Sequence, residues 1–372
     1  MFKKIVFLLL FTCQSVFAQL IDDLPQNKIE KAILFTGTDS IILTHQGLIE
    51  ALPDVQFLVF VSSSLDERKT RKQYIYPNVN IKFLDYPITS WAQDRALRMQ
   101  GSISGVLSEH MSEVSSIYET VALKDAANLL GFPKDENSSD YWISRYTGKD
   151  PFVLSSFKSG YLQSNQSNLF FGDGGDRLVT NNHILLGGNS LTNIKKQNTD
   201  KQIENITKKK LIGIDTAPFD RYAFHLDTFL TPVSDQEIIM GSYNEALKML
   251  PENLSWVDYE FMKKKSQKEI AIIKSLNDIG FNVSLIPLLY KKDDGLISFN
   301  NGVFDNNTFY LSNYNFKNDS IDKWVKIIKE KAKDVYLNKG INLNFIEGGE
   351  NNISLGGQVR CTMAVIFKSS SF

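Results

Sequence analysis

The sequence predicts an α/β protein that folds as one domain. Two observations predict this class: apolar segments of strand length alternate with segments of helical periodicity, and no run rich in proline, glycine and serine divides the chain. Strands and helices that alternate at this spacing are typical of α/β architectures. We therefore expect residues 19–372 to form a single domain, with residues 1–18 removed.

The first 18 residues have the features of a bacterial-type secretory signal. Two lysines precede an apolar run over residues 5–11, and Val16-Phe17-Ala18 supplies a small residue at the cleavage position. The apolar run is too short to span a bilayer, and no later segment is long enough. A lipoprotein anchored on Cys13 is a weaker alternative, because Phe11-Thr12 replace the small residues that normally precede a lipidated cysteine. We expect cleavage after Ala18 and a secreted or periplasmic chain without a membrane span.

The first part of the mature chain alternates strictly between the two kinds of element. We expect strand 32–36, helix 46–52, strand 56–62, helix 65–74 and strand 79–85. Residues 101–160 interrupt this order with helical patches and a polar run, which indicates an insertion that forms part of a rim or lid over a site. An ordinary helical excursion explains the same segment equally well.

Alternation returns after residue 168. Strands are expected at 169–171, 177–180, 183–186, 237–241, 281–286 and 309–311, and helices at 201–210, 259–279 and 320–334. Ser320 is a suitable N-cap for the last helix, because a serine hydroxyl accepts from the first free backbone N–H groups.

Composition and charge exclude one class of partner. Hydrophobic residues make up 42% of the chain and charged residues 22%, as in ordinary globular proteins. The net charge of -1 argues against a nucleic-acid binder, which needs a basic surplus to neutralise phosphates.

Cysteine usage singles out one residue. The chain has two cysteines, Cys13 and Cys361, and the first lies in the segment that we expect to be removed. One remaining thiol cannot form an internal disulfide. A lone cysteine after a Gly-Gly turn in an exported chain suggests a reactive nucleophile, whereas a buried cysteine that acts as a small hydrophobe is the alternative. Both interpretations stay open on this observation alone.

A short pattern occurs twice. Asp173-Gly174-Gly175-Asp176 is followed by Gly187-Gly188, and Glu347-Gly348-Gly349-Glu350 is followed by Gly356-Gly357. This repetition suggests two copies of one supersecondary module, which would bring distant acids, a histidine and a cysteine into one pocket. Coincidence among 22 glycines is the alternative.

Polar side chains that can carry chemistry gather in four segments: 91–95, 171–176, 224–229 and Cys361. If 224–229 is a strand, His225 and Asp227 point to the same face, because side chains alternate with period two. A cysteine protease that pairs Cys361 with a histidine is possible. That interpretation leaves the aspartates of the other segments without roles.

No metal or other cofactor is expected. The four histidines show no paired spacing, and a single cysteine cannot build a thiolate site. Calcium bound by Asp293-Asp294-Gly295 is an alternative, but a solvated turn explains that segment better.

The motifs resemble, in chain order, the signatures of the guanidino-group-modifying superfamily of deiminases and amidinotransferases. They are Trp91-Ala92-Gln93-Asp94, Asp173-Gly174-Gly175-Asp176, residues 225–230 and residues 356–362. The resemblance implies the pentein fold, a fivefold pseudosymmetric α/β propeller. The first and third motifs look most like peptidyl-arginine deiminases, and the last looks like free-arginine deiminases. Agmatine deiminases usually carry Arg in place of Gln93 and His in place of Arg360.

The motif residues suit the chemistry of a guanidinium. Two carboxylates, Asp94 and Asp227, can hold this planar cation in bidentate fashion, and the bound cation favours the thiolate of Cys361. After attack by sulfur, His225 protonates the departing ammonia and then activates water. Asp173 stands where the superfamily has a glutamate and is expected to orient His225.

One further substrate contact follows from the resemblance alone. Ser298-Phe299-Asn300-Asn301 is similar to a Ser-Tyr-x-Asn segment of the superfamily. The similarity implies that Asn301 contacts the substrate.

The sequence therefore predicts an exported hydrolase of amidine C–N bonds that converts the guanidino group of arginine residues, or of arginine-like compounds, to a ureido group as in citrulline. Export favours arginine in peptides or proteins, because free-arginine metabolism is mostly cytoplasmic. Free arginine, agmatine and amidino transfer are alternatives. An inactive pentein that binds guanidino ligands is the alternative from another class.

Overall fold

The computed structural model describes residues 22–84, 90, 96–99, 102–105, 161–163, 168–170, 175–196, 198–215, 225–292, 295–353 and 359–370. The expected secretory signal and most of the expected insertion at 101–160 lie outside these residues, so both stay predictions. No helix in the described residues has the length and apolar character needed to cross a membrane.

Four of the sheets that the described residues form share one arrangement. In each of these sheets, the first strand pairs antiparallel with the second. One or two helices follow the second strand, and the third strand then pairs parallel with the second. We call this unit a module. The α/β class is confirmed, whereas fivefold closure into a propeller stays a prediction.

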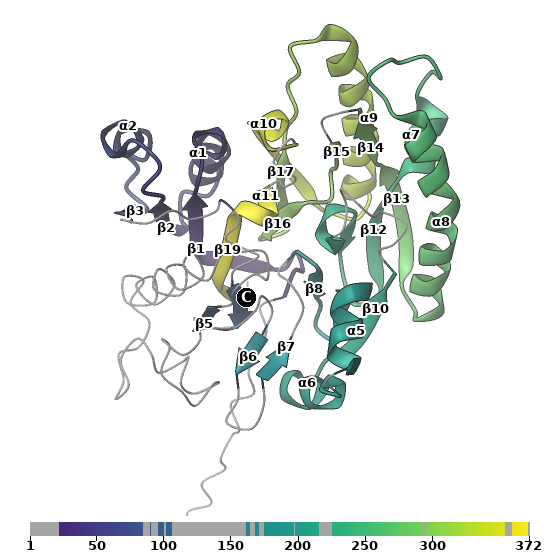
Figure 1. Cartoon of the computed structure of the whole chain (residues 1–372), viewed down its shortest axis with the longest axis horizontal. Helices are drawn as coiled ribbons and strands as arrows, with labels where there is room; N and C mark the ends of the chain where they lie inside the picture. The colour runs from purple at the N-terminus through teal and green to yellow at the C-terminus, as the bar shows by residue number, and fades with distance from the viewer. Residues whose placement is uncertain are drawn as a thin grey trace, which may run out of the picture.

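The first module joins the two ends of the chain. β19 (Met363–Ser370) pairs antiparallel with β1 (Asn27–Thr36), purple beside yellow in Figure 1. The short η1 (Asp39–Ile41) and α1 (Ile42–Ala51) lead to β2 (Gln56–Val61), which is parallel to β1. α2 (Glu67–Gln73) and the parallel strand β3 (Val79–Phe83) extend this sheet.

The second and third modules follow one another along the chain. The second comprises β8 (Arg177–Val179), β9 (His183–Gly187), α5 (Gly188–Lys196), α6 (Asp200–Thr207) and β10 (Lys210–Ile214). The third comprises β11 (Leu230–Pro232), β12 (Glu237–Ser242), α7 (Tyr243–Met249), α8 (Tyr259–Asp278) and β13 (Asn282–Pro287). Figure 1 shows α8 along the outer side of β12 and β13.

The fourth module comprises β16 (Gly302–Asp305), β17 (Thr308–Ser312), α9 (Asp319–Leu337) and β18 (Asn342–Ile346). Three hairpins of the described residues lie outside the modules: β4 (Ala96–Met99) with β5 (Ser102–Gly105), β6 (Tyr161–Gln163) with β7 (Asn168–Phe170), and β14 (Leu289–Lys291) with β15 (Gly295–Ile297). Short helices α10 (Gly349–Ile353) and α11 (Val359–Thr362) precede β19.

The repeated glycine turns do not occupy equivalent places in these modules. Asp173-Gly174-Gly175-Asp176 directly precedes the first strand of a module, β8, and its first two residues lie outside the described ones. Glu347-Gly348-Gly349-Glu350 instead follows the last strand of a module, β18, and enters α10. The chain does repeat one module, but this sequence pattern does not mark the repeat.

Helix α9 shows how the sequence produces these elements. Its buried residues recur at intervals of three and four, which places one apolar face on the core: Ile321, Val325, Ile328, Ala332 and Tyr336. The helix begins one residue earlier than expected, because Asn318, not Ser320, is the N-cap and accepts from the backbone N–H groups of Ser320 and Ile321. The expected N-cap was therefore wrong by two residues.

A buried carboxylate connects the two helices of the third module. Glu269 of α8 is 2% exposed and accepts from the Ser242 hydroxyl and the Tyr243 N–H, both at 2.6 Å, at the start of α7. Burial raises the pKa of Glu269, and these hydrogen bonds act in the opposite direction. The carboxylate thus satisfies N-terminal N–H groups that α7 cannot satisfy itself.

We expect Glu269→Gln to destabilise the fold by about 2 kcal/mol, because the amide brings its own N–H donors against groups that need an acceptor. Urea unfolding of this variant measures the loss. Glu252→Gln is the matched control, since Glu252 is exposed and its ion pair with Lys263 spans 3.8 Å. Equal stability of the two variants would contradict the role of Glu269.

A buried polar cluster lies where β1 ends. The hydroxyl of Tyr74 is 2.8 Å from both the Thr36 hydroxyl and Nδ1 of His45. His45 is fully buried, and its Nε2 has no hydrogen-bond partner among the described residues. Burial lowers the pKa of His45 to about 3, so the folded protein holds this imidazole neutral.

This cluster predicts that the protein begins to lose stability on acidification at a higher pH than the one at which carboxylates titrate. Between pH 6.5 and about 3 the unfolded chain protonates His45 and the folded protein does not, so stability falls with acidification by about 1.4 kcal/mol per pH unit. Urea unfolding at pH 7, 6 and 5 measures the slope. His45→Asn should flatten it, whereas His183→Asn, at a half-buried position, should change it less. An unchanged slope in His45→Asn would exclude this origin.

Candidate active site

The predicted site residues that the structure describes lie just before the first strand of an antiparallel pair. His225 and Asp227 precede β11, Asn301 precedes β16, and Cys361 precedes β19. Because the modules share one topology, these places are equivalent, and hydrogen bonds join residues from all three of them. In the sequence, Asp94 precedes β4 and Asp173 precedes β8, but both residues lie outside the described part and their roles stay predictions.

Cys361 is a free thiol within α11 and is only 3% exposed. The side-chain amide of Asn301 donates to its Sγ at 3.3 Å, and Oδ1 of the same amide accepts the Arg360 N–H at 3.0 Å. The second contact fixes the orientation of the amide, so that its Nδ2 lies nearer to the sulfur than its Oδ1, which is 3.7 Å from Sγ. A donor aimed at sulfur stabilises the thiolate, which is the nucleophilic form.

His225 and Asp227 do not lie in a strand. Residues 226–228 form a short 3₁₀ helix, η6 (Leu226–Thr228), for which His225 is the preceding residue in extended conformation. The expectation that strand alternation places both side chains on one face was therefore wrong. The turn is held by the Thr228 hydroxyl, which donates to the His225 carbonyl at 2.6 Å, and by the Ser298 hydroxyl, which donates to the Thr228 carbonyl at 2.5 Å.

The imidazole of His225 packs directly on Gly175. A Cβ at this glycine would lie 2.2 Å from Nδ1 of His225, so no other residue fits without moving the ring. The carbonyl of Gly175 also accepts the Asp227 N–H at 3.1 Å. The glycine turn of the second module thus positions the His-x-Asp segment of the third.

Asp227 is fully buried and paired with Arg360. Nη1 of Arg360 donates to Oδ2 of Asp227 at 2.6 Å, and Nη2 donates to Oδ1 of Asp23 at 3.0 Å and to the Arg177 carbonyl at 3.1 Å. Burial raises the pKa of Asp227, and the charges of Arg360 and His225 act in the opposite direction. Since a guanidinium stays protonated in proteins, the ionised carboxylate is the form that satisfies this donor.

The remaining oxygen of Asp227 accepts no hydrogen bond from the described residues. This oxygen, Oδ1, is buried. A bound cation with N–H donors can satisfy it. In this arrangement only Oδ1 of Asp227 can accept from a substrate, because Oδ2 accepts from Arg360. Bidentate binding of a guanidinium by Asp227 therefore requires Arg360 to release Oδ2.

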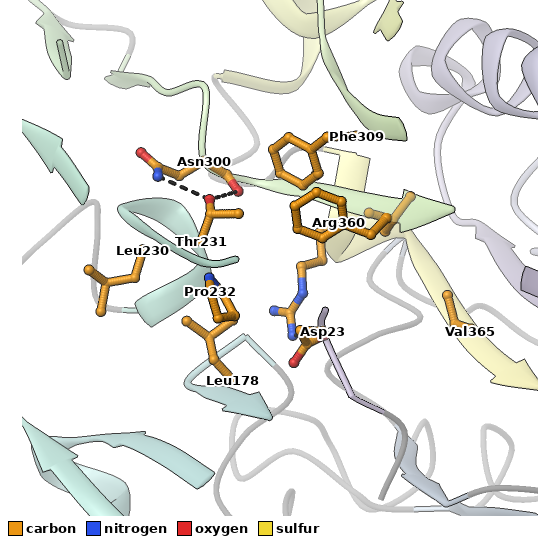
Figure 2. Close-up of a pocket in the computed structure, with 12 residues that line it drawn as sticks. Asp23, Leu178, Leu230, Thr231, Pro232, Asn300, Phe309, Arg360 and Val365 are labelled. Carbon is orange, nitrogen blue, oxygen red and sulfur yellow. Dashed lines mark hydrogen bonds and ion pairs between the residues drawn. The ribbon is translucent and has the colours of Figure 1, made fainter. Parts of the chain in front are cut away.

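A small cavity borders Arg360 on the side shown in Figure 2. Its volume of about 20 Å³ is enough for one water molecule, and its walls include Asp23, Thr231, Asn300 and Phe309. Neither Cys361 nor His225 lines it. The cavity is therefore too small and in the wrong place to be the substrate pocket.

Asp176 is a structural residue of the glycine turn. It is buried, accepts from the Ser190 hydroxyl at 2.5 Å and packs against Gly187, where a Cβ would lie 1.7 Å from its Oδ1. These contacts fix the start of α5. Among the described residues, no group of three or more His, Cys, Asp or Glu side chains is placed to hold a metal ion.

Two residues of the site were missed from the sequence, namely Arg360 and Asp23. Arg360 stands beside the cysteine in the last motif, so the motif could have indicated it. Asp23 carries no sequence signal, because its partner lies 337 residues away.

The chain matches no protein-family model and no curated protein in sequence. Its fold is similar to that of a candidate agmatine deiminase, with a TM-score of 0.55, 12% identity and coverage of 94% of this chain and 99% of the other. It is also similar to that of agmatine deiminase of Enterococcus faecalis, with a TM-score of 0.52, 12% identity and coverage of 94% of this chain and 96% of the other. A third similar structure is that of a candidate arginine deiminase of Porphyromonas gingivalis, with a TM-score of 0.55, 10% identity and coverage of 95% of this chain and 98% of the other. The chain therefore shares its fold with these deiminases, which agrees with the fold that the motif resemblance implies.

The Asn301 contact predicts a measurable change in the thiol. Asn301→Ala removes the donor to Sγ that favours the thiolate, so alkylation of Cys361 at pH 7 should slow. The rate of iodoacetamide labelling, read on the Cys361 peptide by mass spectrometry, measures this change. Asn300→Ala is the control, because Asn300 is buried but bonds to Thr231 and the Ile239 carbonyl instead. Equal labelling rates in the two variants would show that Asn301 does not act on the sulfur.

Proposed function

We propose that this protein is a deiminase that hydrolyses the guanidino group of arginine residues, or of arginine-like compounds, to a ureido group and ammonia. One observation carries the proposal: the buried thiol of Cys361 accepts from Asn301, and the adjacent residue Arg360 is paired with the Asp227 carboxylate in the turn that follows His225. The fold that holds this arrangement is similar to those of agmatine and arginine deiminases.

The proposed reaction uses the site residues in two stages. The Cys361 thiolate attacks the guanidino carbon, and His225 donates a proton to the nitrogen that leaves as ammonia. The resulting S-alkylthiouronium then reacts with water, from which His225 takes one proton and solvent takes the other, and cleavage of the C–S bond releases the ureido product and restores the thiolate. Asp173 is assigned to orient His225, and Asp94 and Asp227 to bind the cationic group.

The proposed substrate class is arginine within peptides or proteins, acted on after export of the chain. The secretory features of residues 1–18 support this choice. Arg360 also supports it over agmatine, because agmatine deiminases usually carry His at this place, and here Arg360 is paired with both Asp227 and Asp23. The structures named for agmatine and arginine deiminases make these small compounds the second candidates.

The proposal predicts thiol-dependent release of ammonia. The panel consists of peptides with internal and C-terminal arginine, free arginine and agmatine, and ammonia and ureido product are measured together. Cys361→Ala should lower turnover by at least about a thousandfold, because the nucleophile is lost. Turnover of agmatine or free arginine without any peptide would correct the substrate class.

Two other outcomes would replace the proposal. Ureido product that forms only poorly, with transfer of the amidino group to an added amine, indicates an amidinotransferase. An inactive binding protein is indicated by three results together. The folded wild type turns over no compound, it does not react with a haloacetamidine probe, and it binds guanidino ligands as tightly as the Cys361→Ala variant does.

A further inference from the structure

We propose that Asp23 is a positioning residue for guanidinium binding: it holds Arg360 so that Oδ1 of Asp227 stays open to the substrate. The inference rests on the proposed function and adds to it a residue from the N-terminal segment. Figure 2 shows the Asp23 and Arg360 side chains facing one another beside the small cavity.

Asp23 is fixed in place by backbone contacts. Its N–H donates to the Val179 carbonyl at 2.7 Å, and its Oδ2 accepts the Val179 N–H at 2.8 Å. The next residue, Leu24, is buried, and the Pro25 carbonyl accepts the Asn307 N–H at 2.7 Å. The segment before β1 is therefore held between the second and fourth modules, with the Asp23 carboxylate directed at Arg360.

The position of Asp23 decides how Arg360 uses its donors. A guanidinium beside a carboxylate prefers two parallel N–H···O bonds. Here Nη1 bonds to Oδ2 of Asp227, but Nη2 is directed to Asp23 and to the Arg177 carbonyl. This division leaves Oδ1 of Asp227 without a partner among the described residues. Without the charge of Asp23, Arg360 is free to turn Nη2 toward Oδ1 and compete with the substrate.

The charge balance acts in the same direction. Two aspartates and one arginine give this buried cluster of described residues a net negative charge, which favours a cationic ligand. Neutralising Asp23 removes that excess. Removing the charge of Arg360 as well restores the net negative charge, and it also removes the side chain that competes with the substrate for Oδ1 of Asp227.

The test compares KM and kcat of Asp23→Asn with wild type, using whichever panel compound wild type turns over. The expected result is a KM raised by about tenfold, with kcat within about threefold, because binding and not the Cys361 chemistry is affected. Adding Arg360→Gln to Asp23→Asn should bring KM back to within about threefold of wild type. A structural defect would not be repaired by a second substitution.

Controls separate the possible causes. Asp22→Asn is the matched control, since Asp22 is adjacent and buried but bonds to the Leu24 N–H and the Asn27 side chain; its KM should stay at the wild-type value. Asp23→Ser is made in parallel, so that the effect of the lost charge can be measured on whichever neutral variant folds. An unchanged KM in the folded neutral variant, or no rescue by Arg360→Gln, would overturn the inference alone. A wild type inactive on the whole panel would overturn the proposed function and this inference with it.

Discussion

The buried guanidinium of Arg360 is the interaction that organises the candidate site while no cationic ligand is bound to Asp227. It connects three separate parts of the chain: the segment before β1, the 3₁₀ turn before β11 and the helix that carries the cysteine. A buried ion pair is costly to break, because one charge then remains without a partner in a medium of low polarity. The Arg360 cluster therefore constrains the relative positions of Asp227 and the helix that carries Cys361 as long as no other cation is bound to Asp227.

The repeated module explains why distant residues meet. In each module the chain reaches its first strand from the same end, so segments that precede these strands converge although they are far apart in sequence. Asn301 and Cys361, which are 60 positions apart, contact one another for this reason. The apolar strands and helices provide the framework, and the short segments before each first strand are left free to carry polar groups.

Much of the framework could be predicted from the sequence, because burial imposes a readable pattern. Strands such as β2 and β12 have continuous apolar runs, and the apolar face of α9 recurs with helical period. Short elements such as α7 and the β14–β15 hairpin were missed, since their patterns span too few residues. The last expected turn of helix 201–210 was wrong, because Lys208 takes a left-handed conformation and ends α6.

The site was predicted less completely than the framework. Motif resemblance predicted roles for His225, Asp227, Asn301 and Cys361, and these roles stay predictions. The strand assumed for the His-x-Asp segment was wrong, because residues 226–228 form a 3₁₀ helix. That turn depends on hydrogen bonds from residues elsewhere in the chain, such as Ser298. The pairing of Arg360 with Asp23 is equally invisible in one sequence, since nothing local indicates which of many acids will meet a given arginine.

The pairing of β1 with β19 has a consequence for how the protein is made. Asn27 lies opposite Ser370, so one edge of β1 finds its antiparallel partner only after β19 has left the ribosome, whereas β2 can pair with the other edge earlier. Cys361 lies just before that last strand, and Asp23 just before the first. The buried cluster of Arg360, Asp227 and Asp23, and the surroundings of Cys361, therefore form only after the chain has been synthesised as far as β19.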